Sequence, residues 1–393
     1  MPKNIVICCD GTGNQIEGNL SNVLKLSQIV ERNERQRVYY DPGIGTIGES
    51  DEWSQLKQNA KGVFGLATGY GLDANVLAAY HYLARNFEAD DDIYLFGFSR
   101  GAYTVRVLAG MLHLIGLLHP DQLNVDGYAL TAYKRASEAG DFSAAWQFQR
   151  VARTRSIPIK FIGVWDTVAS VLVPRSDRLY IPSLLTLPYT RTNPSVETFR
   201  QAIAIDERRR MFRLNRWVEP QEFVPNPFAK ADPVPQQDIK QVWFAGVHAD
   251  IGGGYPEPES ALSKYPLDWM INEAAAVGLR VITTIRNQLA LGHERAGSRN
   301  QYVAPSAIGP IHNSMTAAWQ VLEWLPKHVK WRERPDGPSF LGFYLPLGEP
   351  RLIPEGARIH YSAVARKKAD QNYNPPNWPQ TFETETYAHA PPA

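Results

Sequence analysis

Short apolar runs alternate with longer, helix-like runs along most of the chain. Apolar runs typical of strands buried on both faces lie at residues 5–9, 38–40, 93–98, 160–165 and 242–247. Helical patterns lie at residues 22–32, 72–87, 102–118, 122–138, 142–153 and 266–277. This alternation predicts an α/β fold with a mostly parallel sheet that is covered by helices on both faces.

Two stretches rich in proline and aromatic residues interrupt the alternation. They are VPRSDRLYIPSLLTLPYTRTNP at 173–194 and WVEPQEFVPNPFAKADPVPQQ at 217–237. Ligands of open α/β sheets bind at the carboxyl ends of the strands, so insertions that follow strands are natural walls of a cleft. We expect a single domain over 1–393, with a core at about 1–285, an insertion at about 172–240 that forms part of the cleft, and a C-terminal extension at about 286–393 that packs on the core.

Ser99 lies in the sequence GFSRG, between an apolar strand-like run and a buried helical run. This context matches the strand–turn–helix pattern G-x-S-x-G, in which small residues on both sides let strand and helix pass close together. Such a turn places the hydroxyl at the positive end of a helix, where N–H groups stabilise a developing oxyanion. We interpret Ser99 as a nucleophile, and the alternative is a chance match in a loop.

A serine nucleophile needs a base and an orienting acid. Asp166 directly follows the strand-like run that ends in FIGVW, and His248 follows the next run, which ends in VWFAGV. We expect both at the carboxyl edge of the sheet. The chain order Ser99, Asp166, His248 is that of α/β-hydrolases. The sequence therefore predicts an α/β-hydrolase-like sheet with these three residues as a catalytic triad.

Other residues compete for these roles. Asp166 could instead be a helix N-cap. Asp206 and Asp250 are rival acids, and His360 is a rival base. His248 and Asp250 could also form half of a metal site, but no second cluster of suitable spacing is present in the sequence. We expect neither a metal nor another cofactor.

The first strand-like run ends in CCDGTGN, a turn with two glycines. Backbone N–H groups of Gly11 and Thr12, together with that of Arg100, could form the oxyanion hole. The turn lacks the lysine and hydroxyl pair of a P-loop and the full glycine pattern of a dinucleotide site. The alternative is a turn in which Asp10 and Asn14 only bond their own backbone.

Composition narrows the class of partner. The 393 residues are 44% hydrophobic and 21% charged, with a formal net charge of +1, so the basic excess typical of nucleic-acid binders is missing. The adjacent Cys8 and Cys9 cannot staple distant parts of the fold, and we expect them in a buried strand. We find no signal-peptide pattern and no run suited to span a bilayer. The expected location is cytoplasmic, with signal-independent secretion and transient contact with a membrane surface left open.

Six motifs occur in a characteristic order: DGTGN at 10–14, YYDPGIGT at 39–46, GFSRGAYTVR at 97–106, GVWDTV at 163–168, AIDERR at 204–209 and WFAGVHADIGGGY at 243–255. In this order they resemble the uncharacterised α/β-hydrolase family that includes the catalytic domain of type VI secretion phospholipase effectors. The similarity covers about residues 4–280, with a weaker echo in IPEGARIHYSAVAR at 353–366. The resemblance implies ester hydrolysis, in characterised members of phospholipid acyl chains. It carries the family's serine, aspartate and histidine onto Ser99, Asp166 and His248.

Two classes of function agree with these features. The first is a serine hydrolase that cleaves carboxylic esters through an acyl-enzyme. Lipid or phospholipid acyl esters are favoured because the aromatic and Leu/Pro-rich insertions could line an acyl groove. The second is a non-catalytic α/β module in which Ser99 and the DGTGN turn hold an anion or a phosphate ester at helix N-termini. We expect the first class. The sequence specifies neither the substrate-binding residues nor the oligomeric state.

Overall fold

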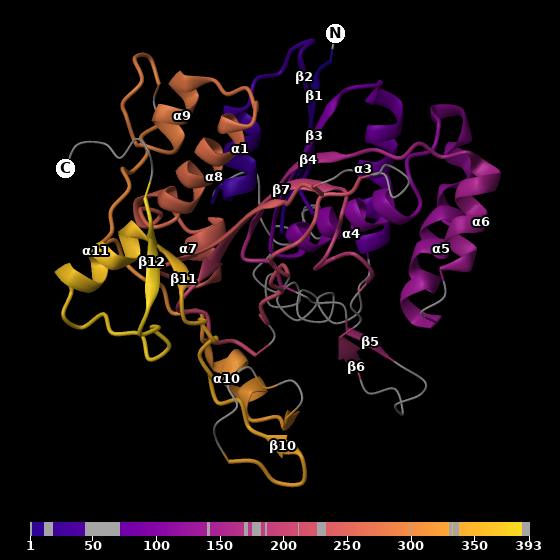
Figure 1. Cartoon of the computed structure of the whole chain (residues 1–393). Coiled ribbons are helices and arrows are strands. Elements are labelled where there is room, and N and C mark those ends of the chain that lie inside the picture. The colour runs from indigo at the N-terminus through magenta and orange to yellow at the C-terminus, as the bar shows by residue number, and fades with distance from the viewer. Residues whose placement is uncertain are drawn as a thin grey trace, which may run out of the picture.

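A sheet of eight strands forms the central layer of the computed structural model (Figure 1). The structure describes residues 2–11, 19–43, 71–139, 142–168, 172–174, 182–184, 187–210, 212–225, 233–298, 300–329, 332 and 338–386. The strands are β1 (Asn4–Cys9), β2 (Gln36–Asp41), β3 (Asp92–Phe98), β4 (Ile159–Trp165), β7 (Val196–Ala204), β8 (Asp238–Phe244), β11 (Ala357–His360) and β12 (Phe382–Glu385). Their order is β12-β11-β8-β7-β4-β3-β1-β2, and all neighbouring pairs are parallel. The predicted α/β fold with a mostly parallel sheet is confirmed.

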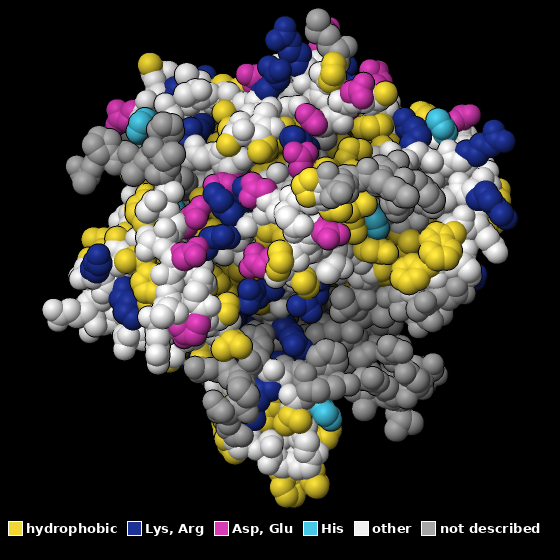
Figure 2. Space-filling view, viewed as in Figure 1, with side chains coloured by type: hydrophobic (Ala, Val, Ile, Leu, Met, Phe, Trp, Pro, Cys, Tyr) yellow, Lys and Arg dark blue, Asp and Glu magenta, His cyan; other side chains and the backbone are white. Residues whose placement is uncertain are grey.

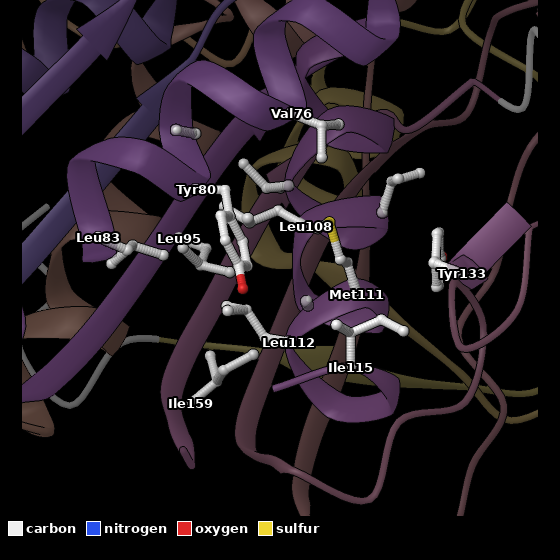
Figure 3. Packing of buried hydrophobic residues seen from close by; sticks show 14 of the residues in the cluster. Val76, Tyr80, Leu83, Leu95, Leu108, Met111, Leu112, Ile115, Tyr133 and Ile159 are labelled. Carbon is white, nitrogen blue, oxygen red and sulfur yellow. The ribbon is translucent and has the colours of Figure 1, made fainter. Parts of the chain in front are cut away.

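Two hydrophobic cores lie on opposite faces of the sheet, because successive side chains of a strand point to opposite sides. Ile5 and Ile7 of β1 belong to one core, and Val6 and Cys8 belong to the other. The first core is covered by α3 (Leu72–Asn86), α4 (Arg100–Leu114), α5 (Asp126–Ala139) and α6 (Ser143–Ala152). The second is covered by α1 (Asn22–Ile29), α8 (Lys264–Ala276) and α9 (Thr283–Leu289). Figure 3 shows the first core, where side chains of α3 and α4 gather against Leu95 of β3. Helices thus cover both faces, as predicted.

Three strands of the sheet were not evident from the hydrophobic pattern. β7 lies within 172–240, where we expected an insertion, and it pairs with β4 and β8 in the middle of the sheet. The hydrophobic pattern did not indicate β7, because it contains Arg200 and arginine is usually a surface residue. In the structure Arg200 is buried, and carboxylate oxygens of Asp238 and Glu273 each lie 2.5 Å from its guanidinium. β11 and β12 come from 286–393 and extend the sheet beyond β8. The C-terminal part of the chain therefore supplies strands to the same sheet as the N-terminal part.

The remaining described elements are short. They are η1 (Pro120–Val125), β5 (Leu172–Pro174), β6 (Pro182–Leu184), α7 (His248–Gly252), η3 (Glu257–Glu259), α10 (Ala317–Glu323), β9 (Lys327–His328), β10 (Phe343–Tyr344) and α11 (Tyr361–Ala369). Cys8 and Cys9 are buried free thiols of β1, as predicted. Within the described ranges, no helix combines the length and apolar character needed to cross a bilayer.

Candidate active site

Ser99 occupies a sharp turn between β3 and α4. Its φ of 55° lies in the left-handed region that residues with a side chain rarely adopt. A Cβ on Gly97 would come within 2.6 Å of the Ala102 backbone, and one on Gly101 would lie 2.0 Å from the Cys9 carbonyl oxygen. The two glycines around Ser99 are therefore required, because β1, β3 and the first turn of α4 approach one another closely.

Asp166 follows β4 at the same edge of the sheet and is also left-handed, with a φ of 37°. Its side chain is fully buried, and Oδ1 accepts the backbone N–H of Ala204 at 3.0 Å. The chain continues from Asp166 to Val168, which bridges to Leu214. Residues 167 and 168, which directly follow Asp166, are not helical. The alternative in which Asp166 is a helix N-cap is therefore wrong. Non-glycine residues in strained conformations concentrate at functional sites.

His248 lies against Asp166, although β7 separates their strands. The distance from His248 Nδ1 to Asp166 Oδ2 is 2.5 Å. An ionised carboxylate only accepts hydrogen bonds, so Nδ1 carries the hydrogen and Nε2 is left as an acceptor. Nε2 is buried and has no hydrogen-bond partner in the part of the chain that the structure describes. The contact at Nδ1 therefore fixes the orientation of the imidazole, and Nε2 remains available to accept a hydrogen bond.

Aromatic rings enclose this imidazole. Phe98, the neighbour of Ser99, and Phe212 each place a ring centroid 4.7 Å from that of His248. Burial lowers the pKa of His248 below its ordinary value, against the opposing pull of Asp166. The backbone N–H of His248 donates to Glu207 at 3.2 Å, which fixes the start of α7. A neutral imidazole near neutral pH follows from these surroundings.

Arg351 is the principal residue of this site that the sequence did not reveal. Its Nη1 lies 2.5 Å from Asp166 Oδ1, and its Nη2 lies 3.0 Å from Oδ2. Burial alone would raise the pKa of Asp166, but Arg351 and His248 hold it below its usual range. A loop arginine two residues before the motif at 353–366 has no periodicity to mark it. Only the weak similarity beside it could have drawn attention to this segment.

The expected oxyanion donors are described in part. Arg100 is the first residue of α4, so its N–H has no acceptor within the helix. Gly11 lies beside Ser99, because a Cβ on it would be 3.3 Å from Ser99 Cβ. Its N–H donates to Asp10 Oδ1 at 2.7 Å. Thr12 lies outside the described residues.

Asp10, which directly follows β1, accepts long-range hydrogen bonds. Its Oδ2 accepts the hydroxyls of Ser21 and Tyr40, the latter at 2.9 Å. The alternative in which Asp10 only bonds its own backbone is therefore wrong. Asn14 lies outside the described residues.

The two rival acids have other partners. Asp206 accepts the N–H of Gly246 at 2.7 Å and the hydroxyl of Tyr373 at 3.0 Å. Burial raises its pKa to about 6. Asp250 lies 2.7 Å from Nδ1 of a different histidine, His312. Each carboxylate therefore has a structural environment of its own.

The rival base His360 has contacts of its own. His360 is buried and stacked on Phe244 at 4.4 Å, with Nδ1 2.8 Å from Ser362 Oγ. Burial lowers its pKa to about 3. Among the residues that the structure describes, no group of three or more His, Cys, Asp or Glu could hold a metal ion.

A cavity of about 740 Å³ opens beside the turn that carries His248. Its lining includes apolar side chains such as Met315, Trp324 and Leu347 and polar ones such as His312. Neither Ser99 nor His248 lines it. The cavity is large enough for part of an amphipathic molecule.

Comparison with known proteins gives a family match over more than half of the chain. The family model described as "T6SS, phospholipase effector Tle1-like, catalytic domain" matches residues 3–273. The uncharacterized protein YEL023C of Saccharomyces cerevisiae is 23% identical over 561 residues, covering 96% of this chain and 81% of that protein.

Two solved structures are also similar. An uncharacterized protein from Pseudomonas aeruginosa has 19% identity and a TM-score of 0.40, covering 72% of this chain and 47% of that one. The Tle1 effector bound to the VgrG spike of the type VI secretion system has 19% identity and a TM-score of 0.31, covering 66% of this chain and 52% of that one. The chain spans about half the length of these two proteins.

Proposed function

Because the chain belongs to the Tle1-like family of type VI secretion phospholipase effector catalytic domains, we propose that it hydrolyses acyl esters of lipids with Ser99, His248 and Asp166. The proposal rests on the buried His248–Asp166 pair, 2.5 Å apart, in which Nε2 of His248 has no hydrogen-bond partner among the described residues. Phe98, directly before the strained Ser99, packs its ring against this imidazole. This is the arrangement that a general base needs.

The proposed reaction has two halves. Ser99 Oγ attacks the ester carbonyl while His248 Nε2 takes the hydroxyl proton, and Asp166 stabilises the imidazolium. The N–H of Arg100, at the positive end of α4, stabilises the oxyanion. The C–O bond then breaks, the alcohol leaves with the proton from His248, and the acyl group stays on Ser99. Water, deprotonated by His248, releases the carboxylic acid and regenerates the serine. Gly11 could add a second N–H only by leaving Asp10.

Phe340, Leu341 and Trp324 form an exposed apolar arm, and this arm supports a lipid substrate over a small ester. Figure 2 shows hydrophobic side chains gathered at the end of the segment that carries β10. Phe340 and Leu341 are 78% and 81% exposed there, and Trp324 after α10 is 65% exposed. Contiguous exposed apolar patches mark sites of interaction, whereas exposed apolar residues that are scattered singly do not. A lipid surface that the arm contacts transiently is the partner that agrees with the proposed substrate.

The proposal is tested by fatty-acid release from phospholipid vesicles and by hydrolysis of a p-nitrophenyl ester. Ser99→Ala should lose both activities while keeping its circular dichroism spectrum, because it removes the attacking oxygen and little volume. Ser143→Ala, which changes an exposed serine at the start of α6, is the matched control and should keep both. Turnover retained in Ser99→Ala contradicts the serine assignment. A folded wild type without activity on any ester favours the anion-binding alternative.

A second pair of variants separates lipid contact from chemistry. Phe340→Ser with Leu341→Ser should reduce fatty-acid release from vesicles but not hydrolysis of the soluble ester. Trp146 and Val151 of α6 are exposed to a similar degree, 63% and 81%, and their serine variants should change neither activity. Equal vesicle activity in all of these variants contradicts a role for the arm.

A further inference from the structure

The guanidinium of Arg351 joins the C-terminal part of the chain to the candidate acid. It is bidentate on the Asp166 carboxylate, at 2.5 and 3.0 Å, and only 3% of Arg351 is exposed. We propose that Arg351 is a positioning residue for ester hydrolysis, which acts through Asp166 on the orientation and basicity of His248. This inference rests on the function proposed above.

Four hydrogen bonds to Asp166 fix the orientation of its carboxylate. Oδ1 accepts the N–H of Ala204 and of Arg351, and Oδ2 accepts those of His248 and Arg351. A carboxylate has about four lone-pair sites, so each is occupied. Bidentate arginine pairs fix the carboxylate plane in addition to their electrostatic attraction. The oxygen that faces His248 Nδ1 is therefore held in place.

Arg351 is itself anchored at both sides of the site. Its Nη1 also donates to the carbonyl oxygen of Ala204 at 3.2 Å, and its Nη2 donates to that of Phe212 at 2.8 Å. Phe212 packs its ring against His248. Asn377 donates to the carbonyl oxygens of Arg351 and Ile205, at 3.1 and 3.0 Å. One side chain thus positions the acid and part of the wall beside the base.

The cation also changes the electrostatic balance at His248. A carboxylate shared with a guanidinium attracts the imidazolium proton less than a carboxylate paired with histidine alone. Among the described residues, Glu207 raises the pKa of His248 and Arg209 lowers it. These two side chains pair with each other, with 2.8 Å between Arg209 Nη2 and Glu207 Oε2, so their effects on His248 oppose each other. Arg351 therefore keeps His248 neutral, and able to accept a proton, at a lower pH than the His248–Asp166 pair alone would allow.

Three variants test this role. Arg351→Met should lower kcat by about 10- to 100-fold, the scale found for partners that orient metal-binding side chains, with little change in KM. The acidic limb of its kcat/KM profile should move to higher pH. Arg351→Lys should recover part of kcat, because a single ammonium supplies charge without the two-pronged geometry. Arg351→Ala should regain activity when guanidinium chloride is added at millimolar concentration, relative to sodium chloride.

Arg366 provides the matched control. It is a buried arginine of α11 that donates to the carbonyl oxygens of Ala307 and Gly309, at 2.9 and 2.6 Å. Arg366→Met should lower stability without moving the pH profile, and guanidinium should not rescue it. Melting temperatures of all variants separate loss of folding from loss of chemistry.

The outcomes are distinct. A pH profile of Arg351→Met or Arg351→Lys that coincides with that of the wild type, or a failure of guanidinium to rescue folded Arg351→Ala, overturns the positioning role. The same kcat loss and pH shift in Arg366→Met also overturns it. If Ser99→Ala stays active, the proposed function has failed instead, and that result is obtained independently of Arg351.

Discussion

His248 and His312 each bind a carboxylate through Nδ1, but their second ring nitrogens have different surroundings. His248 lies 2.5 Å from Asp166, and its Nε2 is buried with no hydrogen-bond partner among the described residues. His312 lies 2.7 Å from Asp250, and its Nε2 lies 3.0 Å from Glu259. His312 has both nitrogens committed, whereas His248 has one available for a reacting proton.

The pKa shifts follow from this difference. Partial burial acts to lower the pKa of His312, but Asp250 and Glu259 outweigh it and the pKa is raised. Burial among aromatic rings lowers the pKa of His248 despite Asp166. Two carboxylates favour the imidazolium, which can bridge but cannot accept a proton. A His–Asp pair therefore indicates a base only where the second nitrogen remains an acceptor.

The largest expected contrast is between alanine variants of the two histidines. His248→Ala should lower kcat for ester hydrolysis about 10⁵- to 10⁶-fold, as much as Ser99→Ala, because a base and its nucleophile act as one unit. His312→Ala should keep most of the turnover. Steady-state kinetics on a soluble ester, with folding checked by circular dichroism, measure both. An inactive, folded His312→Ala beside an active His248→Ala would reverse the assignment.

The two aspartates should differ next most strongly. Asp166→Asn keeps size and reach but favours the wrong tautomer of His248, so kcat should fall about 10⁴-fold with little change in KM. Asp250 accepts the N–H of Val247 and binds His312. Asp250→Asn should therefore cost about 1–2 kcal/mol of stability while kcat stays near that of the wild type. Urea unfolding and kinetics on both variants decide, and a folded, inactive Asp250→Asn with an active Asp166→Asn is the contrary result.

A pH profile sharpens the comparison without disturbing the site. The proposed mechanism needs neutral His248, so kcat/KM should fall as the pH is lowered through the pKa of His248. Because burial lowers that pKa from its ordinary 6.5, the midpoint of the acidic limb should lie below pH 6.5. His312→Ala should leave this midpoint unchanged. A midpoint well above 6.5, or one that moves with His312, speaks against His248 as the base.

The smallest effect is on stability. The pKa of His312 is raised in the folded state, so its contribution is fully present below the unfolded pKa of about 6.5. The contribution is lost as the pH rises through the folded pKa. His312→Ala should therefore cost more stability at pH 5.5 than at pH 9, by about 0.5–1 kcal/mol because the ring is partly exposed. Urea titrations at both pH values measure this, and a larger cost at pH 9 would contradict the charged bridge.

The N-terminal strands of the fold could be predicted because they are apolar on both faces. The runs at 5–9, 93–98 and 160–165 correspond to β1, β3 and β4. β7 escaped notice because its Arg200 and Gln201 are buried, with partners that are distant in sequence. The hydrophobic pattern depends on the type of each residue and not on the distant residue with which a buried polar side chain pairs. For the same reason the central strand β7 lies within 172–240, where we expected an insertion.

The candidate site divides in the same way. Ser99, Asp166 and His248 each follow a strand of one parallel sheet, so their shared edge could be predicted from the sequence. The contact between Arg351 and Asp166 links residues 185 positions apart in the chain. No local pattern encodes such a contact, and it depends on how the C-terminal segment folds back against the end of β7.

The most direct test of the central claim is covalent labelling with a fluorophosphonate, followed by mass spectrometry of the intact protein and its peptides. The account predicts one adduct on Ser99 of the folded wild type. The adduct should be absent in Ser99→Ala, strongly slowed in His248→Ala and unchanged in His312→Ala. A folded wild type that does not react, an adduct on another serine, or equal labelling rates in His248→Ala and the wild type would contradict the account.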